Sequence, residues 1–212
     1  MIKYDFIIPL GTDCSIAGAL SNLGKRKCSF PFDWCIIKLN RIKFLFKNNF
    51  QDFFNKDELI KSGNGFPKTK DNEIYFYHTP EFDKLNETYE ETRKKFDRRC
   101  ERLNKILNEE YNILFIRKAE DDSVKDLEEL VEIIVKKFSK INFKILLINN
   151  IKNEEINSEK LVKKYCERNN FLKYHQNDYF SHSIKDIYSE MSKILNDYEV
   201  NNNQIFNKKS PR

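Results

Sequence analysis

The sequence predicts an α/β fold, a three-layer sandwich with a mainly parallel sheet of about five strands. Short apolar segments alternate with helical patterns along the chain, as in repeated βαβ units. Two of these segments, 112–117 and 143–149, are apolar almost throughout, which is typical of strands buried on both faces. The 212 residues are 40% hydrophobic but include only 5 Gly and 5 Pro, enough apolar material for one core and too few turn residues for an all-β sandwich.

The strand–helix–strand unit in the second half carries the clearest pattern. Residues 124–138 are apolar at spacings of three and four, which predicts an amphipathic helix. This helix connects the strands 112–117 and 143–149, so we expect the two strands to be parallel neighbours with a right-handed crossover. The other predicted strands are 4–10, 74–78 and 171–174. The other predicted helices are 14–23, 39–47, 86–107, 158–169 and 183–198, and residues 61–72 are expected to form a loop.

The sequence indicates one domain over residues 1–198 and a polar linker or disordered tail over 199–212, which would suit a fused C-terminal domain. No apolar segment approaches the ~20 residues needed to cross a bilayer, and the N-terminus lacks a signal-peptide pattern. We therefore expect a cytoplasmic protein that does not bind membranes. The charge of +5 comes from interspersed residues, which argues against nucleic-acid binding and suits an anionic small molecule.

Five cysteines without a CxxC pair, and without a histidine at zinc-finger spacing, predict reduced thiols and no metal. One of them stands apart, because the first predicted strand ends in Gly11-Thr12-Asp13-Cys14-Ser15 and then enters a helix. In open α/β sheets, ligands bind at such a carboxyl edge. Gly11 permits a tight turn, and the potential at the helix N-terminus would stabilise a thiolate at Cys14. The alternative is a buried cysteine beside a cap formed by Asp13.

A cysteine nucleophile needs a base, and three histidines are available. His78 ends the predicted strand 74–78, so it would project at the same sheet edge as Cys14 if those strands are parallel. His182, just before the last predicted helix, is the second candidate. His175 is the third.

Several charged residues are expected in buried surroundings, which requires partners of opposite charge. Asp33, between Phe and Trp, would orient a histidine, bind an arginine or cap the following helix. On a helical wheel at ~100° per residue, Arg99 falls inside the apolar arc, Arg102 lies at its border and Arg98 faces away. Arg117 ends a strand at the predicted edge. A ligand phosphate and a structural salt bridge both suit these guanidinium groups.

Five motifs follow one another between about residues 5 and 150: Leu-Gly-x-Asp-Cys-Ser, Ser-Phe-Pro-Phe-Asp-Trp, a strand ending in His, Arg-Arg-Cys-x-Arg-Leu and Leu-Phe-Ile-Arg. Their order resembles a domain family of unknown function that is labelled papain-like cysteine peptidase. The family usually has Asn at the position of Asp13, and the extra charge here would raise the pKa of Cys14. The resemblance implies these signature positions: Cys14, Asp33, His78, Arg99, Arg102 and Arg117.

The opening strand, loop, cysteine and helix are also similar to a bacterial capsular-polysaccharide acyltransferase family that begins with a strand and Gly-Asn-Cys-Gln. The loop in this chain is one residue longer. That similarity implies an SGNH/flavodoxin-like sandwich in which a Cys–His pair moves an acyl group from coenzyme A to a sugar.

Together these features favour an acyltransferase that moves an acetyl group from acetyl-CoA to a sugar or nucleotide-sugar in glycan biosynthesis. The alternatives are a cysteine hydrolase, either peptidase or esterase, and a non-catalytic module that binds a sugar phosphate. The expected catalytic residues are Cys14, His78, Asp33 and His182. The residues expected to bind the acyl donor and its phosphates are Gly11, Asp13, Ser15, Arg99, Arg102 and Arg117.

Overall fold

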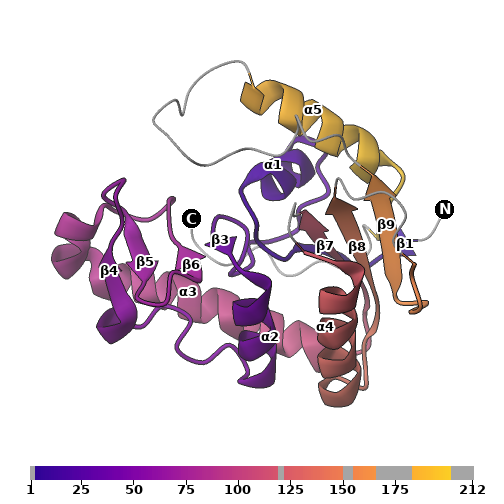
Figure 1. Ribbon diagram of the computed structural model, residues 1–212, viewed down its shortest axis with the longest axis horizontal. Helices are drawn as coiled ribbons and strands as arrows, with labels where there is room; N and C mark the ends of the chain where they lie inside the picture. Colours follow the sequence, from indigo (N-terminus) through magenta and orange to yellow (C-terminus); the bar gives the residue numbers. More distant parts are fainter. Residues whose placement is uncertain (1–2, 119–121, 150–154, 166–182, 202–212) are drawn as a thin grey trace.

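The computed structural model describes residues 3–118, 122–149, 155–165 and 183–201 (Figure 1). Its centre is a four-stranded parallel sheet, which confirms the α/β class. The order of the strands is β2 (Phe6–Pro9), β7 (Asn112–Lys118), β8 (Asn142–Asn149) and β9 (Leu161–Tyr165). The predicted βαβ unit is confirmed, since β7 and β8 pair in parallel and α4 (Val124–Lys137) connects them.

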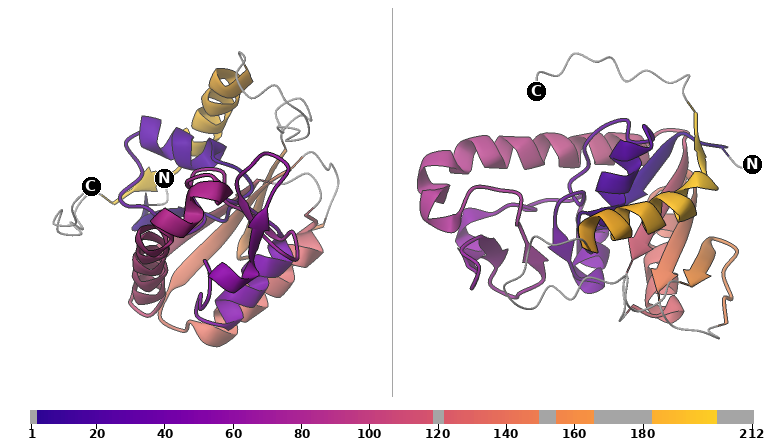
Figure 2. Two further views of the ribbon diagram at one scale, coloured as in Figure 1. Left: turned by 90° about the vertical axis from the view of Figure 1, so that its left-hand side faces the viewer. Right: turned by 90° about the horizontal axis from the view of Figure 1, so that it is seen from above.

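Helices cover both faces of this sheet (Figures 1 and 2). On one face α1 (Ser15–Asn22) packs against α5 (Ser183–Asn196). The other face carries α2 (Leu39–Lys47), α3 (Leu85–Leu107) and α4. Strand side chains alternate between the two cores: Leu114 and Ile116 face α1 and α5, whereas Ile113 and Phe115 face the opposite side.

A second, antiparallel sheet lies at the N-terminal end of α3, away from the parallel sheet (Figure 1). Its order is β3 (Ile36–Ile37), β6 (Ile74–Tyr75), β5 (Pro67–Thr69) and β4 (Leu59–Lys61). Two expectations are wrong here: 74–78 is not a strand of the main sheet, and 61–72 is not simply a loop. The reason is connection length, because the short turns between these strands allow antiparallel pairing, whereas parallel pairing needs a long crossover.

The last part of the main sheet also differs from expectation. Leu161–Tyr165 is strand β9, not part of a helix over 158–169, because pairing with the open edge of β8 overrides a weak helical pattern. The predicted strand 171–174 lies outside the described residues. Glu199–Val200, expected to begin the polar tail, forms β10 and pairs in parallel with β1 (Lys3–Tyr4).

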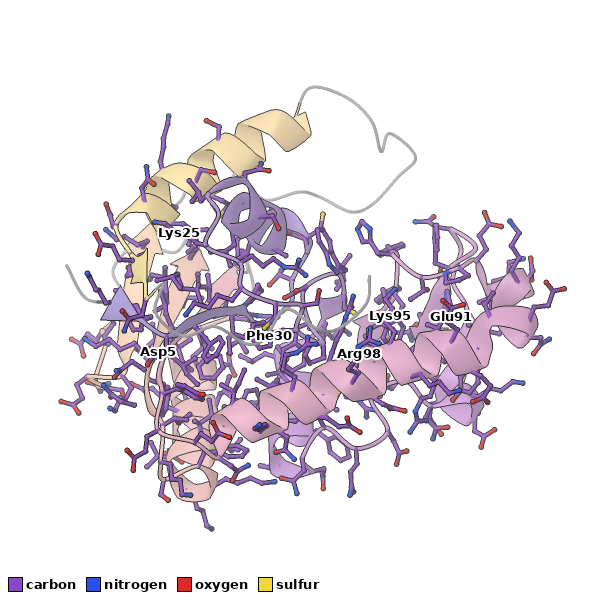
Figure 3. The ribbon with its side chains drawn as sticks, turned by 180° about the vertical axis from the view of Figure 1, so that it is seen from behind. Asp5, Lys25, Phe30, Glu91, Lys95 and Arg98 are labelled. Carbon is purple, nitrogen blue, oxygen red and sulfur yellow. The ribbon has the colours of Figure 1, made fainter. Side chains whose placement is uncertain are left out.

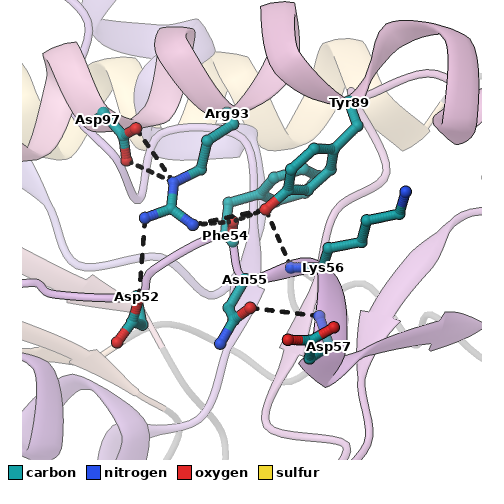
Figure 4. A network of polar contacts seen from close by, with 8 residues as sticks. All are labelled: Asp52, Phe54, Asn55, Lys56, Asp57, Tyr89, Arg93 and Asp97. Atoms are coloured by element: carbon teal, nitrogen blue, oxygen red, sulfur yellow. Dashed lines mark hydrogen bonds and ion pairs between the residues drawn. The ribbon is translucent and has the colours of Figure 1, made fainter.

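Aromatic packing and polar contacts join the antiparallel sheet to α3. The ring of Phe54 lies 4.9 Å from that of Phe76 and 5.0 Å from that of Phe96. The carbonyl oxygen of Phe54 accepts hydrogen bonds from Tyr89 Oη and Arg93 Nη1, both at 3.1 Å (Figure 4). Two 3₁₀ helices flank this region, η1 (Lys56–Glu58) and η2 (Phe82–Lys84).

Candidate functional site

The loop after β2 can hold its shape only with glycine at position 11. Gly11 has a φ of +50°, and a Cβ there would lie 2.4 Å from Ile37 Cγ2 and 3.2 Å from the carbonyl oxygen of Phe32. Side chains rarely adopt this backbone region, and no space exists for one. The absence of a side chain therefore allows the loop that carries Cys14 to press against the segment 32–37. Gly11 has a structural role and offers no side chain to a ligand.

Cys14 immediately precedes α1 at the carboxyl edge of the parallel sheet. It occupies the N-cap position, and its carbonyl oxygen accepts a hydrogen bond of 2.9 Å from Gly18 N. Its side chain is partly exposed, in contrast to Cys35 and Cys100, which are buried. The positive end of the α1 dipole stabilises negative charge at this place. The predicted position of the thiol, at a helix N-terminus, is confirmed.

The other described cysteines are poor nucleophiles because burial disfavours their thiolates. Burial raises the pKa of Cys28 to about 11 and that of Cys100 to about 12. Burial also raises the pKa of Cys35. These three groups stay protonated thiols at neutral pH. Cys166 lies outside the described residues.

A buried ion pair supports the Cys14 loop. Lys118 Nζ lies 2.6 Å from Asp13 Oδ2 and donates a 3.0 Å hydrogen bond to Ser15 Oγ. The other oxygen of Asp13 accepts a 2.7 Å hydrogen bond from Ser15 N. The side chains of Asp13 and Lys118 are only 2% and 1% exposed, so the pair is strong but costly to bury. Lys118 thus balances the negative charge beside Cys14.

Lys118 is the residue that the sequence analysis missed, and the alternation along β7 was the signal that would have found it. Successive side chains of a strand point to opposite faces, so Lys118 and Arg117 must diverge. Lys118 shares the face of Leu114 and Ile116 and reaches the start of α1.

Arg117 points to the other face and joins β7 to two other segments of backbone, residues 10–11 and Ile37. Its Nη1 donates to the carbonyl oxygens of Leu10 and Ile37, both at 2.8 Å, and to that of Gly11. Its Nε forms an ion pair with Asp122. The expectation that Arg117 binds a ligand phosphate is corrected, because backbone carbonyls and one carboxylate hold its guanidinium.

Asp33 binds an arginine, which is one of the three alternatives that the sequence left open. Its Oδ2 accepts hydrogen bonds from Arg26 Nε at 3.0 Å, from Arg26 Nη2 and from Phe30 N at 3.0 Å. Its Oδ1 is buried and has no hydrogen-bond partner among the described residues. Burial raises the pKa of Asp33, although the charge of Arg26 acts against that shift. Asp33 contacts no imidazole among the described residues, so it does not act as the orienting acid of a His78 base.

The burial predicted for the α3 arginines is confirmed. Arg99 is 9% exposed, Arg102 is half-buried and Arg98 is exposed. Arg102 Nη1 donates to the carbonyl oxygen of Ser29, which holds the middle of α3 against the segment before Asp33. Figure 3 labels Phe30 of that segment together with Lys95 and Arg98 of α3.

His78 lies in a turn after β6, a strand of the antiparallel sheet. It therefore does not end a strand of the parallel sheet, contrary to the expectation from the sequence. Contacts place it instead: its ring lies 5.0 Å from that of Trp34, and Trp34 belongs to the segment that Gly11 touches. The residue is exposed, yet partial desolvation of the imidazole, followed by the charge of Lys95, lowers the pKa of His78. The direction of this shift favours the neutral imidazole, which is the form that a general base needs. His175 and His182 lie outside the described residues.

Within the part of the chain that the structure describes, no three His, Cys, Asp or Glu side chains are grouped so that they could hold a metal ion. Across the same residues, no helix combines the length and apolar character of a membrane span.

Fold and site define an α/β protein with a partly exposed cysteine at a helix N-terminus, on the carboxyl edge of a parallel sheet. The chain belongs to the family described as "Putative papain-like cysteine peptidase (DUF1796)", whose model matches residues 5–153. This confirms the resemblance that the sequence motifs indicated. The family description agrees with the cysteine-hydrolase alternative and gives no support to the acyltransferase expectation.

The chain is also similar to "Uncharacterized protein R408" of Acanthamoeba polyphaga mimivirus. The two are 32% identical over 203 residues, which cover 82% of this chain and 89% of the viral protein. No solved structure matches the chain.

Proposed function

We propose that the protein is a cysteine hydrolase that cleaves an ester or amide bond, with Cys14 as nucleophile and His78 as general base. One observation carries the proposal: the side chain of Cys14 is partly exposed at the N-terminus of α1, on a loop fixed by the buried Asp13–Lys118 pair. The family description of the chain agrees with this chemistry. The lowered pKa of His78 favours the neutral imidazole.

In the proposed reaction the imidazole of His78 takes the proton from Cys14 Sγ, and the thiolate attacks the carbonyl carbon of the substrate. Backbone N–H groups in the first turn of α1 stabilise the oxyanion. The C–O or C–N bond then breaks, and the imidazolium gives its proton to the leaving alcohol or amine. Water, deprotonated by the same imidazole, attacks the thioester, releases the acid and restores the thiol.

Hydrolysis of 4-nitrophenyl acetate by purified variants tests the nucleophile. We expect Cys14→Ser to lower kcat/KM by about 10³-fold, because an alcohol is a much weaker nucleophile at this pH. Cys28→Ser is the matched control, since that thiol is protonated, and it should keep wild-type activity. Mass spectrometry should show an acetyl group on Cys14 alone. Equal rates for wild type and Cys14→Ser would refute the proposal.

The pH profile tests the base. If His78 accepts the proton, kcat/KM rises with pH and levels off above the pKa of His78, which burial places below the ordinary value of about 6.5. His78→Ala should remove this acid limb together with most of the activity. A normal profile in His78→Ala, with the limb lost in His182→Ala, would assign the base to His182.

One observation favours acyl transfer as a second candidate. The charges of Asp33, Arg26 and Arg102 act on Arg99, and the charge of Arg99 acts on Lys95. This group of positive charges suits a phosphate-bearing donor such as acetyl-CoA. A transferase would release free CoA thiol only when a sugar or nucleotide-sugar acceptor is added. A hydrolase would release product from simple esters without an acceptor.

A further inference from the structure

The middle of α3 brings cations close to the buried carboxylate of Asp33. Arg99 is 9% exposed, and its charge acts on Asp33, Arg26 and Arg102, whose charges in turn act on it. Lys95 is half-buried and is influenced by Arg99 and by the carboxylate of Glu91.

The cations in this region differ in whether an oxygen atom accepts hydrogen bonds from them. Arg26 holds the carboxylate of Asp33, and Arg102 holds the carbonyl oxygen of Ser29. Arg99 makes neither kind of contact: no described residue accepts a hydrogen bond from its guanidinium or forms an ion pair with it. Its guanidinium lies over the ring of Phe96, whose centre is 5.5 Å from Cζ.

The side chain of Arg99 is largely buried, but its guanidinium nitrogens are not among the fully buried atoms that lack a partner, so they remain open to solvent and to a ligand. A guanidinium in such surroundings favours an anionic oxygen partner. Burial lowers the pKa of Arg99; the charge of Asp33 acts against this shift, and the charges of Arg26 and Arg102 add to it. Burial and then Arg99 also lower the pKa of Lys95. An oxyanion that accepts two hydrogen bonds from Arg99 would both satisfy these donors and relieve the repulsion between the cations.

This region adjoins the proposed catalytic loop. The charge of Arg99 acts on the thiol of Cys35, and the carbonyl oxygen of Cys35 lies 3.3 Å from the position that a Cβ of Gly11 would take. Gly11 and Cys14 belong to the same tight loop.

We propose that Arg99, assisted by Lys95, binds an oxyanion on the substrate, so that the protein cleaves acyl compounds that carry a carboxylate or a phosphoryl group near the scissile bond. The inference rests on the proposed function for its catalytic step, but the oxyanion site stands on the geometry of Arg99. A carboxylate and a phosphoryl group offer the same pair of oxygens to a guanidinium, so the two sources are separated by experiment.

Binding is tested first, in a form that does not depend on catalysis. In Cys14→Ser protein, glutarate or inorganic phosphate at millimolar concentration should raise the melting temperature, whereas sodium chloride of equal ionic strength should not. Arg99→Gln should abolish the rise. Arg98→Gln, on the exposed face of the same helix, is the matched control and should keep it. The anion that gives the larger rise identifies the oxyanion as carboxylate or phosphoryl.

Selectivity is tested second, with two esters of the same leaving group. Wild-type protein should hydrolyse mono-4-nitrophenyl glutarate with a kcat/KM at least about tenfold above that of 4-nitrophenyl butyrate, mainly through a lower KM, because binding to a cation is worth about a factor of ten or more. Arg99→Gln should bring the ratio of the two esters near one, Arg99→Lys should restore part of it, and Arg98→Gln should leave it unchanged.

The two proposals fail in different ways. Equal hydrolysis of both esters by wild-type protein, with no melting shift from either anion, would overturn the oxyanion site and leave the hydrolase intact. An anion-induced shift that requires Arg99, in a protein without Cys14-dependent hydrolysis, would overturn the hydrolase and leave the oxyanion site. If Arg99→Gln does not fold, Arg99→Lys replaces it in both experiments. A melting shift and an ester selectivity identical to those of wild type would then overturn the oxyanion site.

Discussion

The carboxyl edge of the parallel sheet and the aromatic layer beside α3 are buried to a similar degree by different means. At the sheet edge, Lys118 and Asp13 form an ion pair that is almost fully buried, and Arg117 binds three carbonyl oxygens. In the aromatic layer, rings such as those of Phe54 and Phe96 pack face to face at 5.0 Å, and the polar contacts of Figure 4 lie around them.

The difference shows where the fold must fix the position of individual side chains. Apolar packing is non-directional and stabilises the fold in proportion to buried area. A buried ion pair adds little net stability, since desolvation offsets the attraction, but it fixes the position of each group. The most deeply buried ion pair among the described residues, that of Asp13 and Lys118, lies at the loop that carries Cys14, as expected where a reactive side chain must be held. Four substitutions test this comparison.

Arg117→Ala should have the largest effect. Three carbonyl oxygens and Asp122 lose their donor together, so we expect the free energy of unfolding to fall by about 5 kcal/mol, at the upper end for breaking a buried ion pair. Urea denaturation followed by circular dichroism measures the loss, with Arg117→Lys as a milder variant. A loss below about 1 kcal/mol would contradict the role assigned to this side chain.

Phe96→Ala tests the aromatic layer. Phe96 is 2% exposed, and its removal should leave a cavity that costs about 4 kcal/mol of unfolding free energy. The same protein should alkylate at Cys14 with iodoacetamide at the wild-type rate below its melting temperature, because this layer stabilises the fold without positioning the thiol. A slowed alkylation in folded Phe96→Ala would show that the two regions are coupled.

Lys118→Met tests the sheet edge. This substitution leaves the carboxylate of Asp13 buried without its cation, so we expect the free energy of unfolding to fall by about 3 kcal/mol. We also expect slower alkylation of Cys14, because its thiolate then lies beside an unpaired negative charge. Adding Asp13→Asn should recover more than half of both effects, since no charge then remains unpaired. Additive effects in this double-mutant cycle would mean that the two side chains do not interact.

Asp83→Asn should have the smallest effect and serves as the baseline. Its ion pair with Lys61 is exposed on both sides, and such pairs contribute below about 1 kcal/mol. The change should be small in urea denaturation and smaller still at high salt. A loss as large as that of Lys118→Met would remove the distinction between buried and surface pairs.

Much of the fold could be predicted because its signals are local. The α4 pattern, the apolar strands on either side of it and the burial of Arg99 follow from helical and strand periodicity. The error at β6 arose because strand partners are chosen by tertiary contacts, which periodicity does not report. The same limit explains β9, where pairing with β8 decided between helix and strand.

The sequence by itself determined the βαβ core, the glycine-containing loop and the cysteine that begins α1, since each depends on neighbours within a few positions. Only the tertiary structure decided the roles of the charged residues. In the folded chain Asp33 pairs with Arg26, Arg117 donates to backbone carbonyls and Lys118 pairs with Asp13. The physical reason is that a buried charge takes whichever partner the packing brings within hydrogen-bond distance, and those partners come from remote parts of the chain.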